Sequence, residues 1–473
     1  MLIINATSAR FIFFVLLMAG AAGCAHYQAR PLNLAEHAMS FNSGALNDAQ
    51  LQERLDALHM SDAIRSGQWN RAQLLVVASE RNPKISIAKA QLHLVDAAKQ
   101  TASALPNPTL TLGSEYNLSR TAESPWLWSV STDWLLDIGL RRQLRIEVAD
   151  ANVQAVRLDY AEALWTVRSE LRASLLSYLI SARRVQLLTE AQTYQARLLE
   201  MRRERIAQGE SAEGDALQVE LELARTQGNL ADATRISSQS LAQIAATLGM
   251  PVSALQSQSF VWDDLLQVAT LDEESLGHLR DKALLSRTDL EHAVIDYQRC
   301  ELSLQQAVHE QYPQFSIGPG YSWDHGIKKL SLGLSLGLPV FNRNQGPIAE
   351  AQVARDMAGQ QATAVQEKII GEIDLARRLY ISSIKTLQST IQQHDIAEKL
   401  LGQVQQSLAV GASDQTEVIT AQLNLNIQSL AVLDAVEHMQ QSLGQLEDAL
   451  RTPLSGPEVA LSQRALLQVD SVY

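Results

Sequence analysis

Hydrophobic and polar residues alternate along four short stretches of the chain, which predicts four β-strands. In each stretch one face is apolar, and the other carries mainly glycine, serine and threonine. Alternation is common in soluble sheets, but small polar side chains opposite aromatic and aliphatic ones also suit a wall between lipid and water. The stretches are residues 109–118, 126–136, 315–323 and 330–338.

The apolar faces carry aromatic side chains near the strand ends, where a transmembrane barrel has its interface girdles. Four strands cannot close into a barrel, and an open sheet edge in lipid would leave backbone groups unpaired. If these strands span a membrane, several chains must therefore share one barrel. The girdle candidates are Tyr116, Trp126, Trp128, Trp134, Tyr321 and Trp323.

Most of the remaining chain has helical periodicity. In the last helix, Ile419, Leu423 and Ile427 follow steps of four residues. The second helix would be ~100 Å long at ~1.5 Å per residue, which favours helices lying side by side as a coiled-coil wall. The expected helices are residues 75–104, 140–207, 213–248, 276–311, 347–408 and 414–451.

The same order of elements occurs twice, at a spacing of about 200 residues, which predicts an internal duplication. The stretch that begins at Asn107-Pro108 resembles the one that begins at Tyr312-Pro313. The turn at Gly209 likewise resembles the turn at Gly411.

Both turns carry a glycine, a serine suited to helix capping, and an acidic residue six positions after the glycine. Each acid has two interpretations. It can stabilise the start of its own helix through the helix dipole, or several copies around an axis can form a carboxylate ring that favours cations. The first interpretation is favoured for Asp215, and both stay open for Glu417. The turn residues are Gly209, Ser211 and Asp215, and Gly411, Ser413 and Glu417.

The first 23 residues resemble an export signal, with Arg10 before an apolar core and small residues at its end. Cys24 follows directly, which predicts a lipoprotein that is cleaved before Cys24 and acylated on its thiol. The alternative is ordinary signal cleavage beside an incidental cysteine. No later apolar run reaches the ~18 residues that a transmembrane helix needs.

Composition narrows the function further. The net charge of −13 argues against a nucleic-acid-binding protein, and two cysteines exclude a disulfide framework. The ten histidines are scattered without a His/Cys/Met cluster, so we expect neither a metal site nor a cofactor.

One motif suggests an enzyme. Gly333-Leu-Ser335-Leu-Gly337 matches G-x-S-x-G, the nucleophile motif of many hydrolases. A serine hydrolase would need a strand–turn–helix at Ser335, together with Asp and His partners. The strand alternation continues past Ser335 instead, so we predict that the chain is not an enzyme and has no catalytic residues.

The ordered set of motifs resembles the TolC-like outer membrane efflux family over about residues 70–452. The run Leu338–Gly346 and the leader are most similar to its CzcC-type branch, the outer-membrane lipoproteins of cation-efflux pumps. The motifs are Arg81-Asn82-Pro83, Pro108, Pro313, Arg287-Thr288-Asp289-Leu290, Leu338–Gly346 and the two turns.

The resemblance implies a homotrimer that is mostly α-helical with a β-barrel portion. Twelve strands would form one barrel in outer-membrane lipid, and long helices would continue it as a coiled-coil barrel through the periplasm. A periplasmic membrane-fusion adaptor would meet the helix turns, and Asp215 and Glu417 would lie where acids constrict the tunnel entrance. An inner-membrane resistance-nodulation-division (RND) pump would supply the substrate.

The expected division of the chain follows from this resemblance. An equatorial belt would contain residues 24–70, 250–275 and 453–473. The segments are a lipoprotein signal peptide at 1–23, an N-terminal equatorial segment at 24–70, efflux repeats at 71–275 and 276–452, and a C-terminal tail at 453–473.

The leading hypothesis is a passive outer-membrane exit duct for heavy-metal cations. An outer membrane factor for drug efflux or type I secretion stays open, because the resemblance alone carries the metal specificity. A hypothesis of another class is a periplasmic coiled-coil scaffold lipoprotein, which would not need four lipid-facing strands.

Overall fold

The computed structural model describes residues 27–46, 48–60, 62–118, 124–136, 140–210, 212–269 and 273–462. The chain divides into two units, with the boundary between Gly44 and Ala45, and each is described by itself. The first unit contains helix α2 (Leu34–Asn42), which begins with the Asn33 side chain accepting a hydrogen bond from the Glu36 amide at 3.2 Å. The leader at 1–23 and Cys24 lie outside the described residues.

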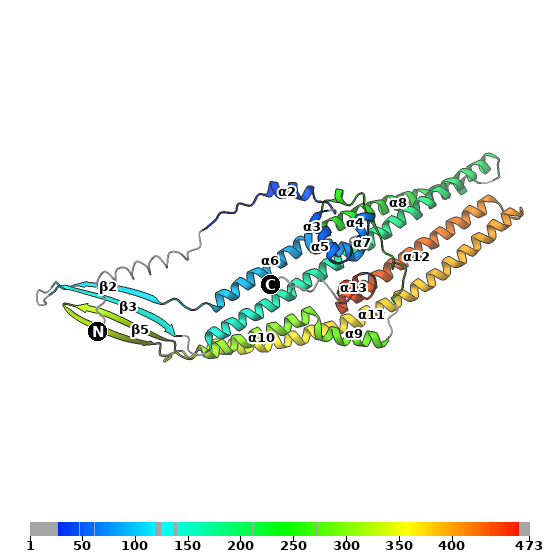
Figure 1. The fold of residues 1–473 in the computed structure, drawn as a ribbon. Helices are drawn as coiled ribbons and strands as arrows, with labels where there is room; N and C mark the ends of the chain where they lie inside the picture. The colour runs from blue at the N-terminus through cyan, green and yellow to red at the C-terminus, as the bar shows by residue number, and fades with distance from the viewer. Residues whose placement is uncertain are drawn as a thin grey trace. The chain divides into compact units, whose positions relative to one another are not determined.

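The second unit contains the long helices and the strands (Figure 1). Its shorter elements are α3 (Ala49–Ala57), α4 (Asp62–Ser66), β1 (Gln68–Trp69), α5 (Arg71–Arg81), η1 (Val252–Ala254), β4 (Ser259–Phe260), α9 (Glu273–Ser286) and α13 (Glu458–Ser462). Its longer elements are α6 (Pro83–Ser103), β2 (Thr109–Tyr116), β3 (Trp126–Leu136), α7 (Arg141–Ala207), α8 (Glu213–Leu248), α10 (Thr288–His309), β5 (Phe315–Asp324), β6 (Ile327–Leu336), α11 (Gln345–Ala409) and α12 (Gln415–Leu450).

The predictions of the four longest helices are confirmed to within a few residues at each end by α7, α8, α11 and α12. A helix, a hairpin, a long helix and a return helix follow one another twice, as α6 to α8 and as α10 to α12. The duplication that would explain this order stays a prediction. Among the described residues, no helix is both long enough and apolar enough to cross a membrane.

The two shorter helices were predicted as continuous, and this is wrong. Asn82 separates α5 from α6 and caps α6, where Pro83 takes the first position. The buried Asn82 amide also donates to the Thr247 carbonyl oxygen at 2.7 Å. Arg287 is extended between α9 and α10 and donates to the Ala449 carbonyl oxygen at 2.8 Å. Both breaks are thus fixed by a carbonyl close to the end of a return helix.

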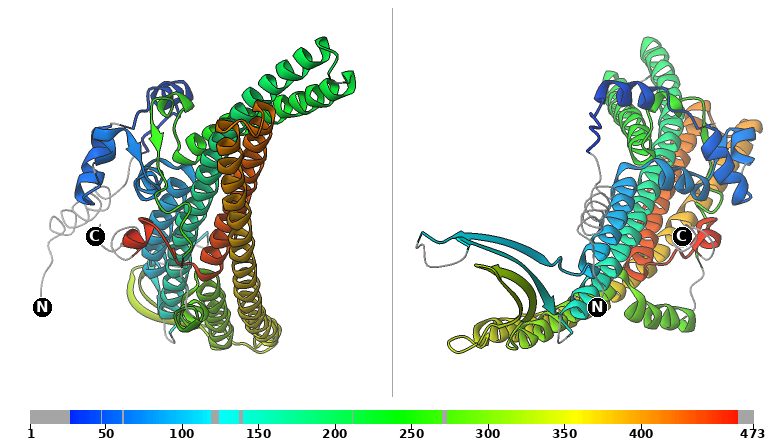
Figure 2. Two further views of the ribbon diagram at one scale, coloured as in Figure 1. Left: turned by 90° about the vertical axis from the view of Figure 1, so that its right-hand side faces the viewer. Right: turned by 60° about the vertical axis from the view of Figure 1, so that its left-hand side comes forward.

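Helix α7 lies at the centre of the helical layer and packs on α6, α8, α10 and α12, whereas α11 packs on α10 and α12. The α7–α8 and α11–α12 hairpins each end in a tight turn at the end of the helices remote from the strands (Figures 1 and 2). Helices α6, α8 and α11 are therefore the outermost members of the layer within one chain.

The four longer strands form one antiparallel sheet in the order β2-β3-β5-β6. The predicted strands are confirmed, but β6 begins at Ile327 rather than at residue 330. His325 and Gly326 have positive φ angles of 50° and 106° and form a two-residue turn, so pairing continues to Asp324 opposite Ile327. The charged pair Lys328-Lys329 hid this part of the strand from the hydrophobic pattern.

The main hydrophobic core lies part-way along the long helices and encloses a network of buried charges. Glu447 on α12 is fully buried, and its Oε2 lies 2.8 Å from Arg168 Nη2 and 3.1 Å from Arg172 Nε, both on α7. Arg168 Nε also donates to Glu458 Oε2 on α13 at 2.9 Å. Oε1 of Glu447 accepts a hydrogen bond from the Leu454 amide at 2.8 Å. The network thereby fixes the segment after α12 against α7.

A third arginine, Arg71, extends the network to the N-terminal part of the unit. Arg71 Nη2 lies 2.9 Å from both carboxylate oxygens of Asp264, and its guanidinium lies 4.2 Å from the centre of the Trp262 ring. Gly456 passes so close that a Cβ atom there would lie 1.7 Å from Arg71 Nη2. The pairing of β1 with β4 joins the same two segments through their backbones.

The charge of Glu447 is favoured by this environment. Burial by itself would raise the pKa of the carboxyl, but the positive charges of Arg168 and Arg172 outweigh burial and hold the pKa below its ordinary value of 4.5. The ionised group therefore stabilises the fold above about pH 4.5, and this stability is lost as the pH falls through the lower pKa of the folded state.

We predict that Glu447→Gln lowers the free energy of unfolding by about 3–5 kcal/mol, because it leaves two buried guanidinium groups without their shared carboxylate. Denaturant unfolding of the purified protein in detergent at pH 7 measures this change, and the variant should lose less stability than the wild type on acidification. Glu200→Gln, in the exposed Arg197–Glu200 pair, is the control and should leave unfolding unchanged. Equal effects of the two substitutions would contradict the importance of the network.

Candidate functional site

The sheet has one apolar face that nothing in the described chain covers. Leu330 is 88% exposed, and Leu332 and Leu334 are each at least 70% exposed. The register places Leu332 opposite Pro319 and Leu334 opposite Ile317, so the apolar side chains of neighbouring strands lie on the same face. An exposed apolar surface of this kind requires lipid or another protein to cover it.

The aromatic candidates cluster mainly at one end of this face. Tyr116 is opposite Trp126, with ring centres 4.9 Å apart, and Trp128 is opposite Trp323. Tyr321 lies one pair further along, opposite Val130, and Trp323 is half-buried whereas the other five are exposed. Trp134 is eight positions from Trp126, or ~27 Å at ~3.4 Å per residue, close to the ~25 Å of an apolar membrane band.

The opposite face of the sheet is lined by small residues. Gly318 is opposite Gly333, Ser131 is opposite Gly320, and Ser335 is opposite Ser316. Ser335 lies inside β6, and no turn or helix follows it directly. The structure thus confirms that Ser335 lies in a strand and not in the nucleophile turn of a hydrolase.

The two helical turns have the same backbone geometry. Gly209 and Gly411 have φ angles of 78° and 75°, which favour glycine. The Gly209 amide donates to the Ile206 carbonyl at 2.9 Å, and the Gly411 amide donates to the Leu408 carbonyl at 3.0 Å. In each turn the next amide reaches back one residue further, to Arg205 or Ser407, which completes a Schellman motif.

The predicted capping role of Ser413 is wrong. Asp414 caps α12, since its side chain accepts a hydrogen bond from the Glu417 amide at 2.9 Å. The Ser413 hydroxyl donates to the Glu417 carboxylate instead. Ser413 and Asp414 are adjacent, and both residue types suit a helix cap. The charged Asp414 carboxylate is the stronger hydrogen-bond acceptor. Ser211 lies outside the described residues, and the N-cap of α8 is Ala212, which has no side-chain cap hydrogen bond.

Both acidic candidates are exposed in the first turns of their helices. Asp215 follows the N-cap of α8 by three residues, and Glu417 follows that of α12 by three. Their positions suit the helix-dipole interpretation. They also leave both carboxylates exposed, as a carboxylate ring would require. Arg205 Nη1, near the end of α7, lies 3.6 Å from Asp414 Oδ2 and brings the two turns together within one chain.

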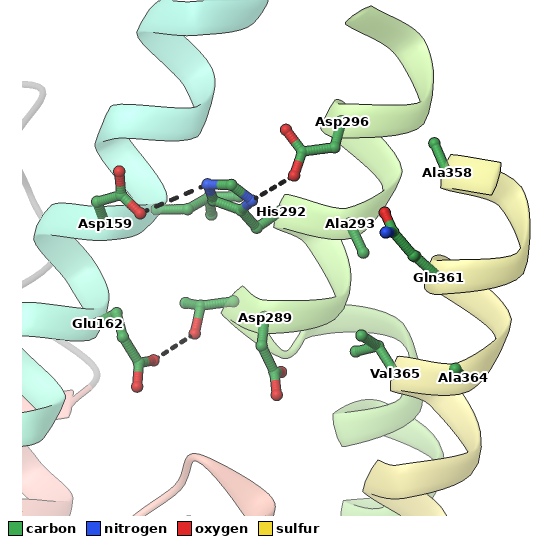
Figure 3. A pocket seen from close by; sticks show the side chains of 12 residues that line it. Asp159, Glu162, Asp289, His292, Ala293, Asp296, Ala358, Gln361, Ala364 and Val365 are labelled. Carbon is green, nitrogen blue, oxygen red and sulfur yellow. Dashed lines mark hydrogen bonds and ion pairs between the residues drawn. The ribbon is translucent and has the colours of Figure 1, made fainter. Parts of the chain in front are cut away.

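A groove of about 600 Å³ lies between α7, α10 and α11, and each of its charged residues has a partner in the groove or beside it (Figure 3). The His292 ring lies between two acids, with Nε2 3.5 Å from Asp159 Oδ1 and Nδ1 3.1 Å from Asp296 Oδ2. Glu162 accepts hydrogen bonds from Thr288 and Arg451, each at 2.7 Å. These residues therefore link neighbouring helices.

Asp289, on the same groove, is paired with Arg287. Burial alone would raise the pKa of the Asp289 carboxyl, but hydrogen bonds from Arg287 at 2.6 and 2.9 Å outweigh it and hold the pKa below its ordinary value. Cys300, also on α10, is half-buried rather than buried.

The buried charges around Glu447 were not found from the sequence. Arg168 and Arg172 are spaced as on an exposed helix face, and their partners lie 268 to 290 positions away. The available signal was that both arginines share a helix face with Leu164, Leu171 and Leu175.

The chain matches the family model described as "Outer membrane efflux protein" over residues 74–250 and 279–450. The chain belongs to the outer membrane efflux protein family. The two matched segments begin within α5 and α9 and end with the return helices α8 and α12. As a member of this family it is a transport channel and not an enzyme, in agreement with the strand position of Ser335.

Relatives of this efflux protein include the cobalt-zinc-cadmium resistance protein CzcC of Cupriavidus metallidurans. The two are 25% identical over 319 residues, which cover 65% of this chain and 71% of CzcC. This similarity agrees with the expected CzcC-type branch.

Solved structures support the fold. CusC, whose structures concern folding and transmembrane channel formation, matches with a TM-score of 0.65 at 18% identity and covers 80% of this chain and 91% of its own. The outer membrane protein VceC from Vibrio cholerae matches with a TM-score of 0.64 at 16% identity and covers 81% of this chain and 97% of its own.

We predict that Gly411→Ala destabilises the α11–α12 turn by about 1 kcal/mol, because alanine is strained at a φ of 75°. Gly402→Ala, nine residues earlier in the interior of α11, has open space for a Cβ atom and should be neutral or stabilising. Hydrogen exchange of the amides at the end of α11 in the two variants measures the difference. Faster exchange in both variants, or in neither, would contradict the prediction.

Proposed function

We propose that this efflux protein is the outer-membrane exit duct of a tripartite RND-type system and passively conducts divalent metal cations out of the cell. The observation that carries the duct is the sheet, which has an exposed apolar face and a face of small residues. The outer edges of its two edge strands, β2 and β6, have no partner in the described chain. A membrane has no water to satisfy such edges, so other chains must pair with them.

Three copies would complete the structure. Edge strand β6 of one copy would pair with β2 of the next, which gives a closed barrel of twelve strands. The outermost helices α6, α8 and α11 carry exposed apolar side chains, including Ile87, Leu221 and Leu375, and these would be covered in the same contacts. A periplasmic scaffold would have no use for the exposed leucine face, which supports the duct over that alternative.

The helical turns are the proposed contact with a periplasmic membrane-fusion adaptor. Their two Schellman motifs are alike in backbone geometry and present Gly209 and Gly411 at the surface. The proposed adaptor contact also includes Ser413 in the second turn and Glu210 in the first. The accessible carboxylates of Asp215 and Glu417 would repeat around the axis and attract cations at the tunnel entrance. Glu417, held by Ser413 and the Asp414 cap, is the stronger candidate.

The proposed cargo rests on CzcC, whose name describes resistance to cobalt, zinc and cadmium. We also propose that the protein is anchored by an acyl chain on Cys24, which the mass of the purified chain would reveal.

Residues 24–70, 250–275 and 453–473 form the proposed equatorial belt around the tunnel. The pairing of β1 with β4 supports the grouping of the first two segments. The closeness of Gly456 to the Asp264 carboxylate supports the addition of the third.

We predict that Leu332→Lys prevents membrane assembly, because a lysine in the middle of a lipid-facing strand costs about 2–4 kcal/mol. Ser331→Lys is the control, since the neighbouring side chain points to the other face and would meet water in the lumen. Assembly is measured as SDS-resistant oligomer in the outer-membrane fraction and as ion conductance after reconstitution into lipid vesicles. A wild-type protein that stays monomeric and forms no channels would refute the duct itself.

Cargo is tested separately by deleting the gene and measuring growth in Zn²⁺, Cd²⁺ and Co²⁺ and in a panel of drugs. We expect lower tolerance of the metals, restored by the wild-type gene. Glu417→Gln should restore tolerance less well than Asp215→Asn if the carboxylate ring lies at Glu417. Lost drug tolerance with unchanged metal tolerance would replace metal efflux with drug efflux.

A further inference from the structure

We propose that His394, Asp395 and Glu398 on α11 form a binding site for a divalent transition-metal cation such as Zn²⁺ or Co²⁺. One donor atom from each side chain can be chosen so that all three lie within 4.8 Å of one another. Among the described residues, this is the group of three possible metal ligands that lie so close together. Glu398 follows His394 by four residues and Asp395 by three, so the helix places the three side chains on neighbouring positions.

The distances are close to those of a coordinated ion. Donors bound to Zn²⁺ at ~2.0–2.2 Å lie ~3–3.5 Å from one another. Nδ1 of His394 lies 3.9 Å from Oδ1 of Asp395. Both acids are exposed, so small rotations of their side chains would bring the donors to these distances.

The two carboxylates also lack the partners that other surface acids have. On the long helices, Glu200, Glu222 and Asp232 each pair with an arginine three residues away. Within the described parts of the chain, the ion-pair contact of Asp395 is with His394, and no lysine or arginine pairs with Asp395 or Glu398. Two unneutralised carboxylates beside an imidazole favour a cation.

The imidazole is less exposed than the two carboxylates. Its ring is half-buried and borders an apolar groove lined by Leu187, Ile391 and Leu433. Arg183 also lines this groove, and its Nη1 donates to Gln186 Oε1 at 2.8 Å. The helix thus places a half-buried ring beside two exposed acids before any ion binds.

The donor types determine the class of ion. Mg²⁺ and Ca²⁺ prefer six or more oxygen ligands, whereas one imidazole nitrogen with two carboxylates suits Zn²⁺, Co²⁺ or Ni²⁺. Three protein donors leave positions for water, so the ion would exchange readily.

The sequence analysis expected no metal site because it looked only for clusters of His, Cys and Met. A single histidine followed by Asp and Glu is not such a cluster, so this group was missed. The site is independent of the proposed function, because binding is measured on the purified chain.

The test compares Zn²⁺ binding by the full-length wild type with binding by His394→Gln and Glu398→Gln. The proteins are purified in detergent without a polyhistidine tag, stripped with chelator and examined by calorimetry and equilibrium dialysis. His438→Gln is the matched control. His438 follows Asp434 by four residues and Glu437 by one, but Arg184 occupies these two acids at 2.8 and 3.0 Å.

We expect the wild type and His438→Gln to bind one more Zn²⁺ per chain than either site variant, in the presence of excess Mg²⁺. Circular dichroism checks that the helices of each variant are intact, and Glu398→Gln is an exposed substitution that keeps the test valid if His394→Gln unfolds. Equal Zn²⁺ binding by the wild type and Glu398→Gln would overturn the site. An equal loss in His438→Gln would do the same, since it would indicate unspecific binding.

Discussion

The arrangement of this chain depends on one buried carboxylate between two arginines. Helices of 67 and 65 residues cannot be held by a compact core along their whole length. The main core lies at one level, and there Glu447 joins α12 to α7. Arg168 attaches the segment that follows α12, and Arg71 joins the start of α5 to the segment that follows β4. A buried charge is costly unless it is paired, so each segment must take its place for the others to be stable.

The sequence was sufficient where structure follows from local periodicity. The long helices repeat their apolar positions every three or four residues, and the strands alternate, so both could be predicted to within a few residues. The breaks at Asn82 and Arg287 could not, because their partners lie 165 and 162 positions away. The charged network could not be predicted for the same reason. Arg168 and Glu447 have the sequence pattern of surface residues, and only the packing of α7 against α12 buries them.

Among the site residues, local chemistry gave the correct backbone but not always the correct side chain. Glycine at the two turns was predictable, because a positive φ angle selects it. The choice of Asp414 over Ser413 as the cap was not, since both residue types accept hydrogen bonds from a helix start. Exposure of the aromatic and leucine side chains required the strand register, which decides which residues share a face.

The two helix breaks also bear on how internal symmetry is detected. Asn82 and Arg287 differ in size, charge and donor geometry, yet each donates to the carbonyl oxygen of the residue that precedes the last residue of a return helix, Thr247 or Ala449. The acceptor is backbone and is therefore present whatever the side chain there. A comparison that scores side-chain identity counts a mismatch at this position, although both halves of the chain make the same bond. The predicted duplication would therefore leave a trace in main-chain acceptors that a comparison of side chains does not detect.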